Sequence, residues 1–233
     1  SLGLEPEKIA ADIRVNDQPV ASGDGRAMID RDTNSTYKMT PFKSKEEWET
    51  FAAPLRQKFL VACGLWPLPE KTPLNAKVEP VATHPDYIVE KVSFEAYPGF
   101  LVTGNLYRPV GDGPYPGVIC PHGHWEHGRF ENTDLCSVSG RCITFARMGM
   151  AAFCYDMVGY NDSKQFPRGW GHSGGNVSEE QRRLEGLWGI HPFAMQLWSA
   201  VRALDFMETL PYVNKDKLAC TGASGGGTQT FAL

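Results

Sequence analysis

The sequence predicts an α/β protein whose mostly parallel sheet is flanked by helices and preceded by an antiparallel hairpin. Three short apolar runs, at residues 115–123, 149–156 and 217–222, have the length and composition of buried strands. Helical patterns at residues 136–148 and 192–210 separate these runs. Strands that alternate with helices in this way are typical of βαβ units, in which a parallel sheet is covered on both faces.

The chain divides by its patterns into three segments. Residues 1–40 are polar, rich in Asp, Asn, Gly and Thr, and without a sustained period, so we expect an irregular N-terminal arm. Residues 41–86 predict a helix and a proline-rich, extended connector. Residues 87–233 hold the strand-like and alternating patterns and are expected to form the α/β domain.

The helix of the second segment has clear boundary signals. Ser44 and Glu47 form a capping-box pattern at its start, and Gly64 is a stop signal at its end. Pro54 lies between them, so we expect one proline interruption in this helix.

The sequence also predicts a hairpin around Pro98-Gly99 and an amphipathic helix at residues 192–210. From residue 88, two strand-like runs flank Pro98-Gly99, which indicates a hairpin. The helix at 192–210 is amphipathic. The stripe that we expect it to bury comprises Phe193, Leu197, Val201, Leu204 and Met207.

Composition excludes two classes of partner. The formal charge of −4 and the absence of a run of Lys and Arg give no footprint for nucleic acid. No stretch approaches the ~20 apolar residues of a membrane span, so we expect no membrane partner. The N-terminus lacks the layout of a signal peptide, which leaves a cytoplasmic protein or one whose signal was removed.

The cysteines lack C-x-x-C spacing, which favours buried free thiols over a disulfide framework.

One of two G-x-S-x-G segments has the context of a nucleophile elbow. Ser224 follows a predicted strand and precedes a helix-compatible run, with Gly222 and Gly226 on either side. In an elbow, a strained turn exposes the serine, and the glycines let neighbouring backbone pass closely. The backbone N–H of Gly225 would then face the developing oxyanion. A tight turn without chemistry is the alternative.

The second G-x-S-x-G segment is centred on Ser173. It lies in a polar stretch that contains neither an adjacent strand nor a buried helix. We therefore expect a glycine-rich loop there rather than a nucleophile.

A histidine-rich segment follows the strand at 115–123 and supports two interpretations. In the first, the chain turns at His122 and the backbone N–H of His124 becomes the second oxyanion donor. In the second, His122, His124 and His127, with Glu126 between them, approximate a metallohydrolase cluster, and His191 serves as a later ligand. We favour the oxyanion turn, because a metal site leaves the elbow unexplained.

Asp156 and Gly159 follow the strand at 149–156, at the edge where open α/β sheets bind ligands. We favour a turn in which the Asp156 carboxylate caps backbone groups.

These segments resemble the α/β-hydrolase superfamily, and within it the acetyl xylan esterase-like branch. The resemblance covers about residues 60–233. It is carried by "YPGVICPHGH", "YDMVGYNDS" and "VNKDKLACTGASGGGTQT", and also by "GLWPLPEKTPL" and "GFLVTGNLYRP". It implies a serine carboxylesterase that works through an acyl-enzyme, needs no cofactor, and cleaves small acyl esters, acetyl above all, on small molecules or carbohydrates. It also suggests an exported protein, and it leaves the oligomeric state open.

The sequence departs from this resemblance in one respect that concerns catalysis. The superfamily orders its triad Ser, Asp or Glu, then His, whereas the last acid here is Asp216 and the last histidine is His191. The arginine of a D-x-R-G-like stretch is replaced by Val158. We expect that the chain is the N-terminal portion of an esterase whose acid and histidine follow Leu233, and that the isolated chain is inactive.

Two alternatives to a divided triad stay open. An earlier histidine, such as His172 or His191, could act as the base, because triads occur in other chain orders on other folds. The chain could also be a non-catalytic binding or scaffold protein that keeps the elbow only as a turn.

Overall fold

A computed structural model describes residues 41–166, 178–187 and 191–233. The chain separates into two compact units, Ser1–Trp48 and Glu49–Leu233, and the second contains the sheet. The predicted arm over residues 1–40 lies outside the described residues. The helices and strands of the described residues are α3 (Lys45–Ala62), β1 (Lys77–Thr83), β2 (Tyr87–Tyr97), β3 (Phe100–Pro109), β4 (Tyr115–Ile119), η1 (Gly128–Phe130), α4 (Val138–Arg147), β5 (Ala151–Tyr155), η2 (Asn161–Ser163), α5 (Glu179–Leu187), α6 (Pro192–Thr209), β6 (Val213–Cys220) and α7 (Gly225–Ala232).

The described strands form one six-stranded sheet in the order β1-β2-β3-β5-β4-β6. β1, β2, β3 and β5 pair antiparallel, and β4 pairs parallel with β5 on one side and β6 on the other. The α/β class is therefore confirmed, with the parallel pairing confined to β5, β4 and β6. The carboxyl ends of these three parallel strands meet at one edge of the sheet, the kind of edge where open α/β sheets bind ligands.

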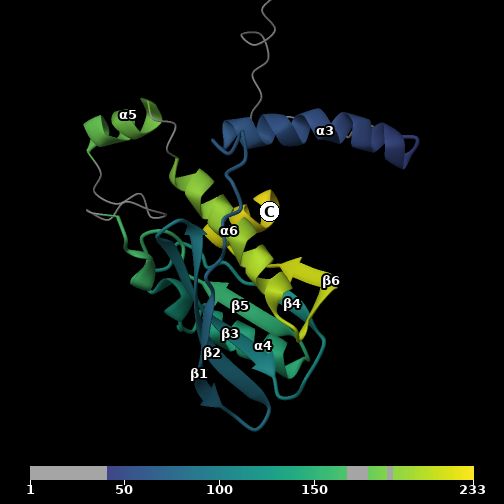
Figure 1. Cartoon of the computed structure of the whole chain (residues 1–233), viewed down its shortest axis with the longest axis vertical. Helices are drawn as coiled ribbons and strands as arrows, with labels where there is room; N and C mark the ends of the chain where they lie inside the picture. The colour runs from purple at the N-terminus through teal and green to yellow at the C-terminus, as the bar shows by residue number, and fades with distance from the viewer. Residues whose placement is uncertain (1–40, 167–177, 188–190) are drawn as a thin grey trace, which may run out of the picture. The chain divides into compact units, whose positions relative to one another are not determined.

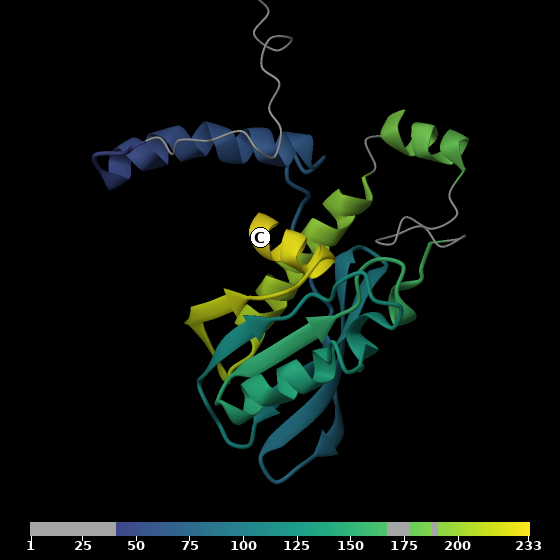
Figure 2. The same cartoon turned by 180° about the vertical axis from the view of Figure 1, so that it is seen from behind.

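Helices cover both faces of the sheet, as predicted. α6 packs on one face and contacts β2, β4 and β6, and α4 packs on the opposite face against β3 and β5 (Figures 1 and 2). The residues of β5 alternate between the two cores: Phe153 and Tyr155 join the core under α6, and Ala152 and Cys154 join the core under α4. This double burial explains why the run is continuously apolar.

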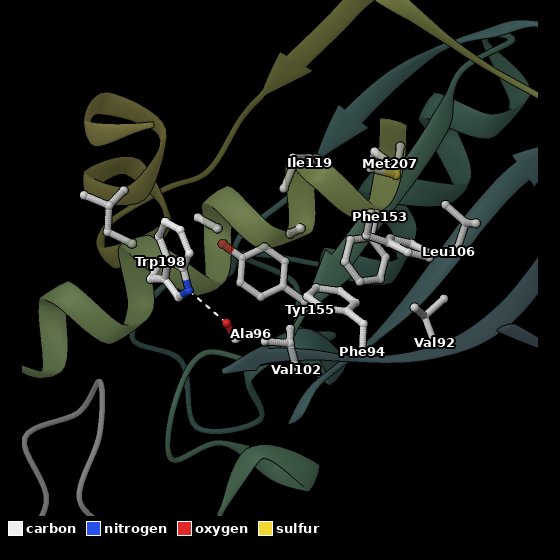
Figure 3. Close-up of a cluster of buried hydrophobic side chains, with 14 of the residues drawn as sticks. Val92, Phe94, Ala96, Val102, Leu106, Ile119, Phe153, Tyr155, Trp198 and Met207 are labelled. Atoms are coloured by element: carbon white, nitrogen blue, oxygen red, sulfur yellow. Dashed lines mark hydrogen bonds between the residues drawn. The ribbon is translucent and has the colours of Figure 1, made fainter. Parts of the chain in front are cut away.

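The larger core lies between α6 and the sheet and is rich in aromatic side chains (Figure 3). Trp198 of α6 is 1% exposed and donates its Nε1–H to the carbonyl oxygen of Ala96 at 2.8 Å. Ala96 lies where the β2–β3 register shifts, between Glu95 and Tyr97. The shift takes Ala96 out of the regular ladder, and the indole of Trp198 bonds its carbonyl oxygen.

The capping box of α3 is present. Ser44 Oγ accepts the N–H of Glu47 at 3.2 Å, and the Glu47 carboxylate accepts the N–H of Lys43 at 2.7 Å. The helix continues through Pro54, so the predicted interruption does not end it.

Two expectations about individual elements are wrong, and a third is only partly right. β1 lies within the segment that was predicted to be a connector. The prediction missed this strand because its side chains are mostly exposed and Pro80 lies at a register shift, so the sequence carries no buried-strand signal. The burial predicted for β6 is not found: most of its side chains are exposed or half-buried, because β6 is an edge strand among the described strands. The stripe predicted for α6 is confirmed at Leu197 and Met207, which are buried. Phe193, Val201 and Leu204 are only half-buried, and the stripe missed the buried Trp198 and Phe206.

All six cysteines are free thiols in this structure. Cys120, Cys142 and Cys154 come from the end of β4, from α4 and from β5, and they lie together in the core under α4. Hydrogen bonds that Cys142 donates to Cys120 and Cys154, together with burial, raise the pKa of the Cys142 thiol. Among the described residues, no helix combines the length and apolar character needed to cross a membrane.

Candidate active site

The loops that leave β4, β5 and β6 meet at one edge of the sheet. β4 and β6 are neighbours with Ile119 opposite Cys220, and the N–H of Thr221 donates to the carbonyl oxygen of Ile119 at 2.9 Å. The loops that follow these two strands are therefore brought together, although about 100 residues separate them in the chain.

Ser224 lies in the turn between β6 and α7, as the elbow pattern predicts. Its backbone has φ +55° and ψ −120°, a region that residues with a side chain rarely adopt. Its side chain is exposed, and α7 begins at the next residue, Gly225. A strained backbone that presents an exposed hydroxyl at a helix N-terminus is the geometry of a nucleophile elbow.

Backbone contacts between two loops hold this turn. A Cβ added at Gly226 would collide with the carbonyl oxygen of Pro121, and one added at Gly222 would lie 2.5 Å from the carbonyl carbon of Gly226. Across the same contact, a Cβ on Gly123 would lie 2.8 Å from the carbonyl oxygen of Ala223. Only glycine fits such close backbone approach, which agrees with a steric role for Gly222 and Gly226.

His122 is fully buried, and backbone groups bond both of its ring nitrogens. Nδ1 lies 2.7 Å from the carbonyl oxygen of Gly123, and Nε2 lies 3.1 Å from the backbone nitrogen of Met157. Because the carbonyl can only accept and the N–H can only donate, Nδ1 carries the proton and Nε2 is bare. His122 therefore fixes the loop after β5 against the loop after β4, and neither nitrogen is available to a metal.

His124 lies on the opposite side of this loop and is exposed. Its Nδ1 is 2.6 Å from Ser224 Oγ, so the two side chains are hydrogen-bonded. The esterase interpretation of the sequence gave His124 a role only through its backbone N–H, and it left His172 or His191 as a possible base. His172 and Ser173 lie outside the described residues. His191 packs against Gly64 and lines a different cleft, of about 560 Å³.

A buried ionic cluster, which the sequence pattern did not indicate, joins the loops after β4 and β5. Arg129 is 6% exposed, and it pairs with the fully buried carboxylate of Asp156 and with Asp162 at 2.6 Å. Its Nε–H also donates to Asn105 Oδ1 at 2.9 Å. Asp156 further accepts the side-chain amide of Asn161 at 2.7 Å and the N–H of Asp162 at 3.4 Å. The capping role expected for Asp156 is therefore present, with an ion pair added to it.

The structure gives no support to the metallohydrolase alternative. Within the part of the chain that the structure describes, no group of three or more His, Cys, Asp or Glu side chains is arranged to hold a metal ion. His122 is buried, whereas His124, Glu126 and His127 are exposed, and His191 lines a different cleft, so the five predicted ligands do not converge.

Comparison with known proteins defines the fold class. No protein-family model matches the sequence, and no curated protein is similar to it in sequence. Among solved structures, methylesterase BT1017 is 26% identical with a TM-score of 0.59, over 81% of this chain and 39% of its own. An acetyl xylan esterase from Paenibacillus sp. R4 is 19% identical with a TM-score of 0.54, over 83% of this chain and 56% of its own. A glucuronoyl esterase from Solibacter usitatus is 14% identical with a TM-score of 0.53, over 83% and 57%.

The chain therefore has an α/β-hydrolase fold. Within that fold it is similar to the acetyl xylan esterases and related esterases, as its motifs suggested. It spans 39% to 57% of the length of the three structures named.

Proposed function

We propose that this chain is the nucleophile-bearing portion of a serine carboxylesterase. The observation that carries the proposal is Ser224 itself, which combines φ +55°, an exposed hydroxyl and the first turn of α7. A binding or scaffold protein has no need of a strained backbone at an exposed serine, so this geometry favours catalysis over that alternative.

The proposed chemistry follows from the groups around the turn. Ser224 Oγ attacks the ester carbonyl, and the backbone N–H groups of His124 and Gly225 stabilise the resulting oxyanion. The alcohol leaves, and water hydrolyses the acyl-enzyme. The carboxylate and histidine that complete a triad stay a prediction.

The substrates that we propose are small acyl esters, acetyl above all, on a small molecule or a carbohydrate. The support is the similarity in fold to esterases whose names specify acetyl xylan and glucuronoyl substrates. No cofactor enters this chemistry. An exported location rests on the same similarity.

Stoichiometric acylation tests the proposal on this chain. With p-nitrophenyl acetate, we expect up to one equivalent of nitrophenol and an acetyl group on Ser224, detected by mass spectrometry of the peptide. Sustained turnover is not expected, because regeneration of the serine is assigned to a complete triad. Acetylation that persists in Ser224→Ala would overturn the assignment of the nucleophile.

Substrate class is tested by competition. An acetylated xylo-oligosaccharide should slow acetylation by the aryl ester more than the deacetylated sugar does. Equal protection by the two sugars would contradict recognition of the ester group.

A further inference from the structure

We infer that the imidazole of His124 takes the hydroxyl proton of Ser224 when the serine attacks an electrophile. This chain then holds a serine–histidine pair of its own. The inference rests on the nucleophilic role proposed for Ser224, and it gives the side chain of His124 a function where only its backbone had one. It concerns the attack step and not complete turnover.

The 2.6 Å distance between His124 Nδ1 and Ser224 Oγ lies within the range of a nucleophile and its general base. Both side chains are exposed, so a reagent can reach the pair from solvent. In the neutral imidazole, the nitrogen that accepts the hydroxyl proton is Nδ1, and Nε2 carries the ring proton.

Rigid surroundings fix the distance between the two residues. Gly123 and Ala223, which immediately precede His124 and Ser224, are in backbone contact. On the other side, buried His122 anchors the loop to Met157. The pair is thus built on two loops that backbone contacts hold together, so its geometry costs little to maintain during attack.

His124 activates Ser224 only when its imidazole is neutral. When neutral His124 accepts the proton, the Ser224 oxygen becomes a stronger nucleophile, and the imidazolium that forms can return its proton to a leaving group. When His124 is already protonated, Nδ1–H donates to Oγ instead, and the hydroxyl is not activated. Reactivity should therefore fall when the imidazole is protonated in acid.

A fluorophosphonate probe isolates this step. Ser224 Oγ forms a bond to phosphorus, the P–F bond breaks, fluoride leaves, and the hydroxyl proton passes to His124 Nδ1. We would measure the rate of labelling of the 233-residue chain by intact mass between about pH 5 and 9, and locate the adduct by peptide analysis. The wild-type chain should be labelled at Ser224 faster in alkaline than in acidic buffer, because only the neutral imidazole accepts the hydroxyl proton.

Two substitutions separate proton transfer from positioning. His124→Asn keeps a hydrogen-bonding group near the position of Nδ1 but cannot accept a proton, and His124→Ala removes both. We expect both variants to label more slowly by on the order of 100-fold, with the pH dependence lost. His84→Asn is the matched control, because His84 is also exposed but lies in the turn between β1 and β2, and its rate should not change.

Added imidazole gives a readout that a structural role would not move. It should restore part of the labelling of His124→Ala, since the site is exposed, and should not restore Ser224→Ala. Circular dichroism of each variant shows whether it is folded.

The outcomes distinguish this inference from the proposed function. If Ser224 is labelled and the rate is the same in His124→Asn, His124→Ala and wild type, the inference is wrong and the nucleophile stands. Retention of the rate in His124→Asn but not in His124→Ala would also overturn proton transfer. If the wild-type adduct forms elsewhere than on Ser224, the proposed function fails.

Discussion

The loops after β4 and β5 bury charged groups against one another, whereas the turn after β6 contains no charged side chain and leaves its serine exposed. In the first region, Arg129, Asp156 and Asp162 form an ionic cluster in which the guanidinium and the Asp156 carboxylate are buried. In the second, Gly222 and Gly226 allow backbone to touch backbone. The comparison teaches that electrostatics fix the supporting loops while steric fit fixes the reactive turn.

The largest effect should come from the ionic cluster. Arg129→Met leaves the buried carboxylate of Asp156 without its cation, so we expect a loss of about 3–5 kcal/mol in the free energy of unfolding. Denaturant titration checks this. Arg147→Met is the control, because the Arg147–Asp86 pair is exposed and should contribute no more than about 1 kcal/mol. Equal losses in the two variants would remove the contrast between the regions.

Gly226→Ala tests the steric side of the comparison. The added methyl group meets the carbonyl oxygen of Pro121, and we expect a loss of about 1–3 kcal/mol together with slower labelling of Ser224. Gly186→Ala is a suitable control, because nothing lies near a Cβ at Gly186 and alanine favours its helix. A Gly226→Ala variant as stable and reactive as wild type would show that the contact is relaxed.

Ser224→Gly should be more stable than Ser224→Ala by about 1 kcal/mol, because glycine adopts positive φ without strain and alanine does not. Thermal unfolding of the two variants under the same conditions measures the difference. Equal melting temperatures would mean that the turn carries no strain.

The smallest difference is expected between wild type and Ser224→Gly at alkaline pH, because neither serine nor glycine has a side chain that ionises there. Burial raises the pKa of Tyr97 to about 12 and also raises the pKa values of Tyr107, Tyr155 and Tyr212. The folded state therefore holds these protons more tightly than the unfolded chain. The stability that results is fully present below about pH 10 and falls as pH rises from there toward about 12. Urea midpoints measured at about pH 9, 10 and 11 should decrease in the same way in wild type and in Ser224→Gly.

Local signals predicted the position of the candidate nucleophile well. The strand, turn and helix around Ser224 are contiguous in the chain, so their patterns could be interpreted together. The hairpin and the helices over both faces followed in the same way from the periodicity and punctuation of neighbouring residues.

What the sequence missed depends on contacts between distant segments. The bond between His124 and Ser224 requires β4 and β6 to be neighbours, which chain order does not state. Arg129 lies in a polar stretch that resembles an exposed loop, and its burial follows only from the positions of Asp156 and Asp162. His122 and His124 are both histidines and lie two positions apart in the chain. His122 is nevertheless buried between two loops, whereas His124 bonds the serine.

Trp198, whose indole bonds the Ala96 carbonyl oxygen, is a buried fluorophore that can report on the core. Because this ring is sealed in the core while Trp48 and Trp66 are about half exposed, acrylamide should quench the latter two first. The emission that survives quenching comes in part from Trp198, in the core between α6 and the sheet. Its loss would mark the opening of the core separately from movements at the surface.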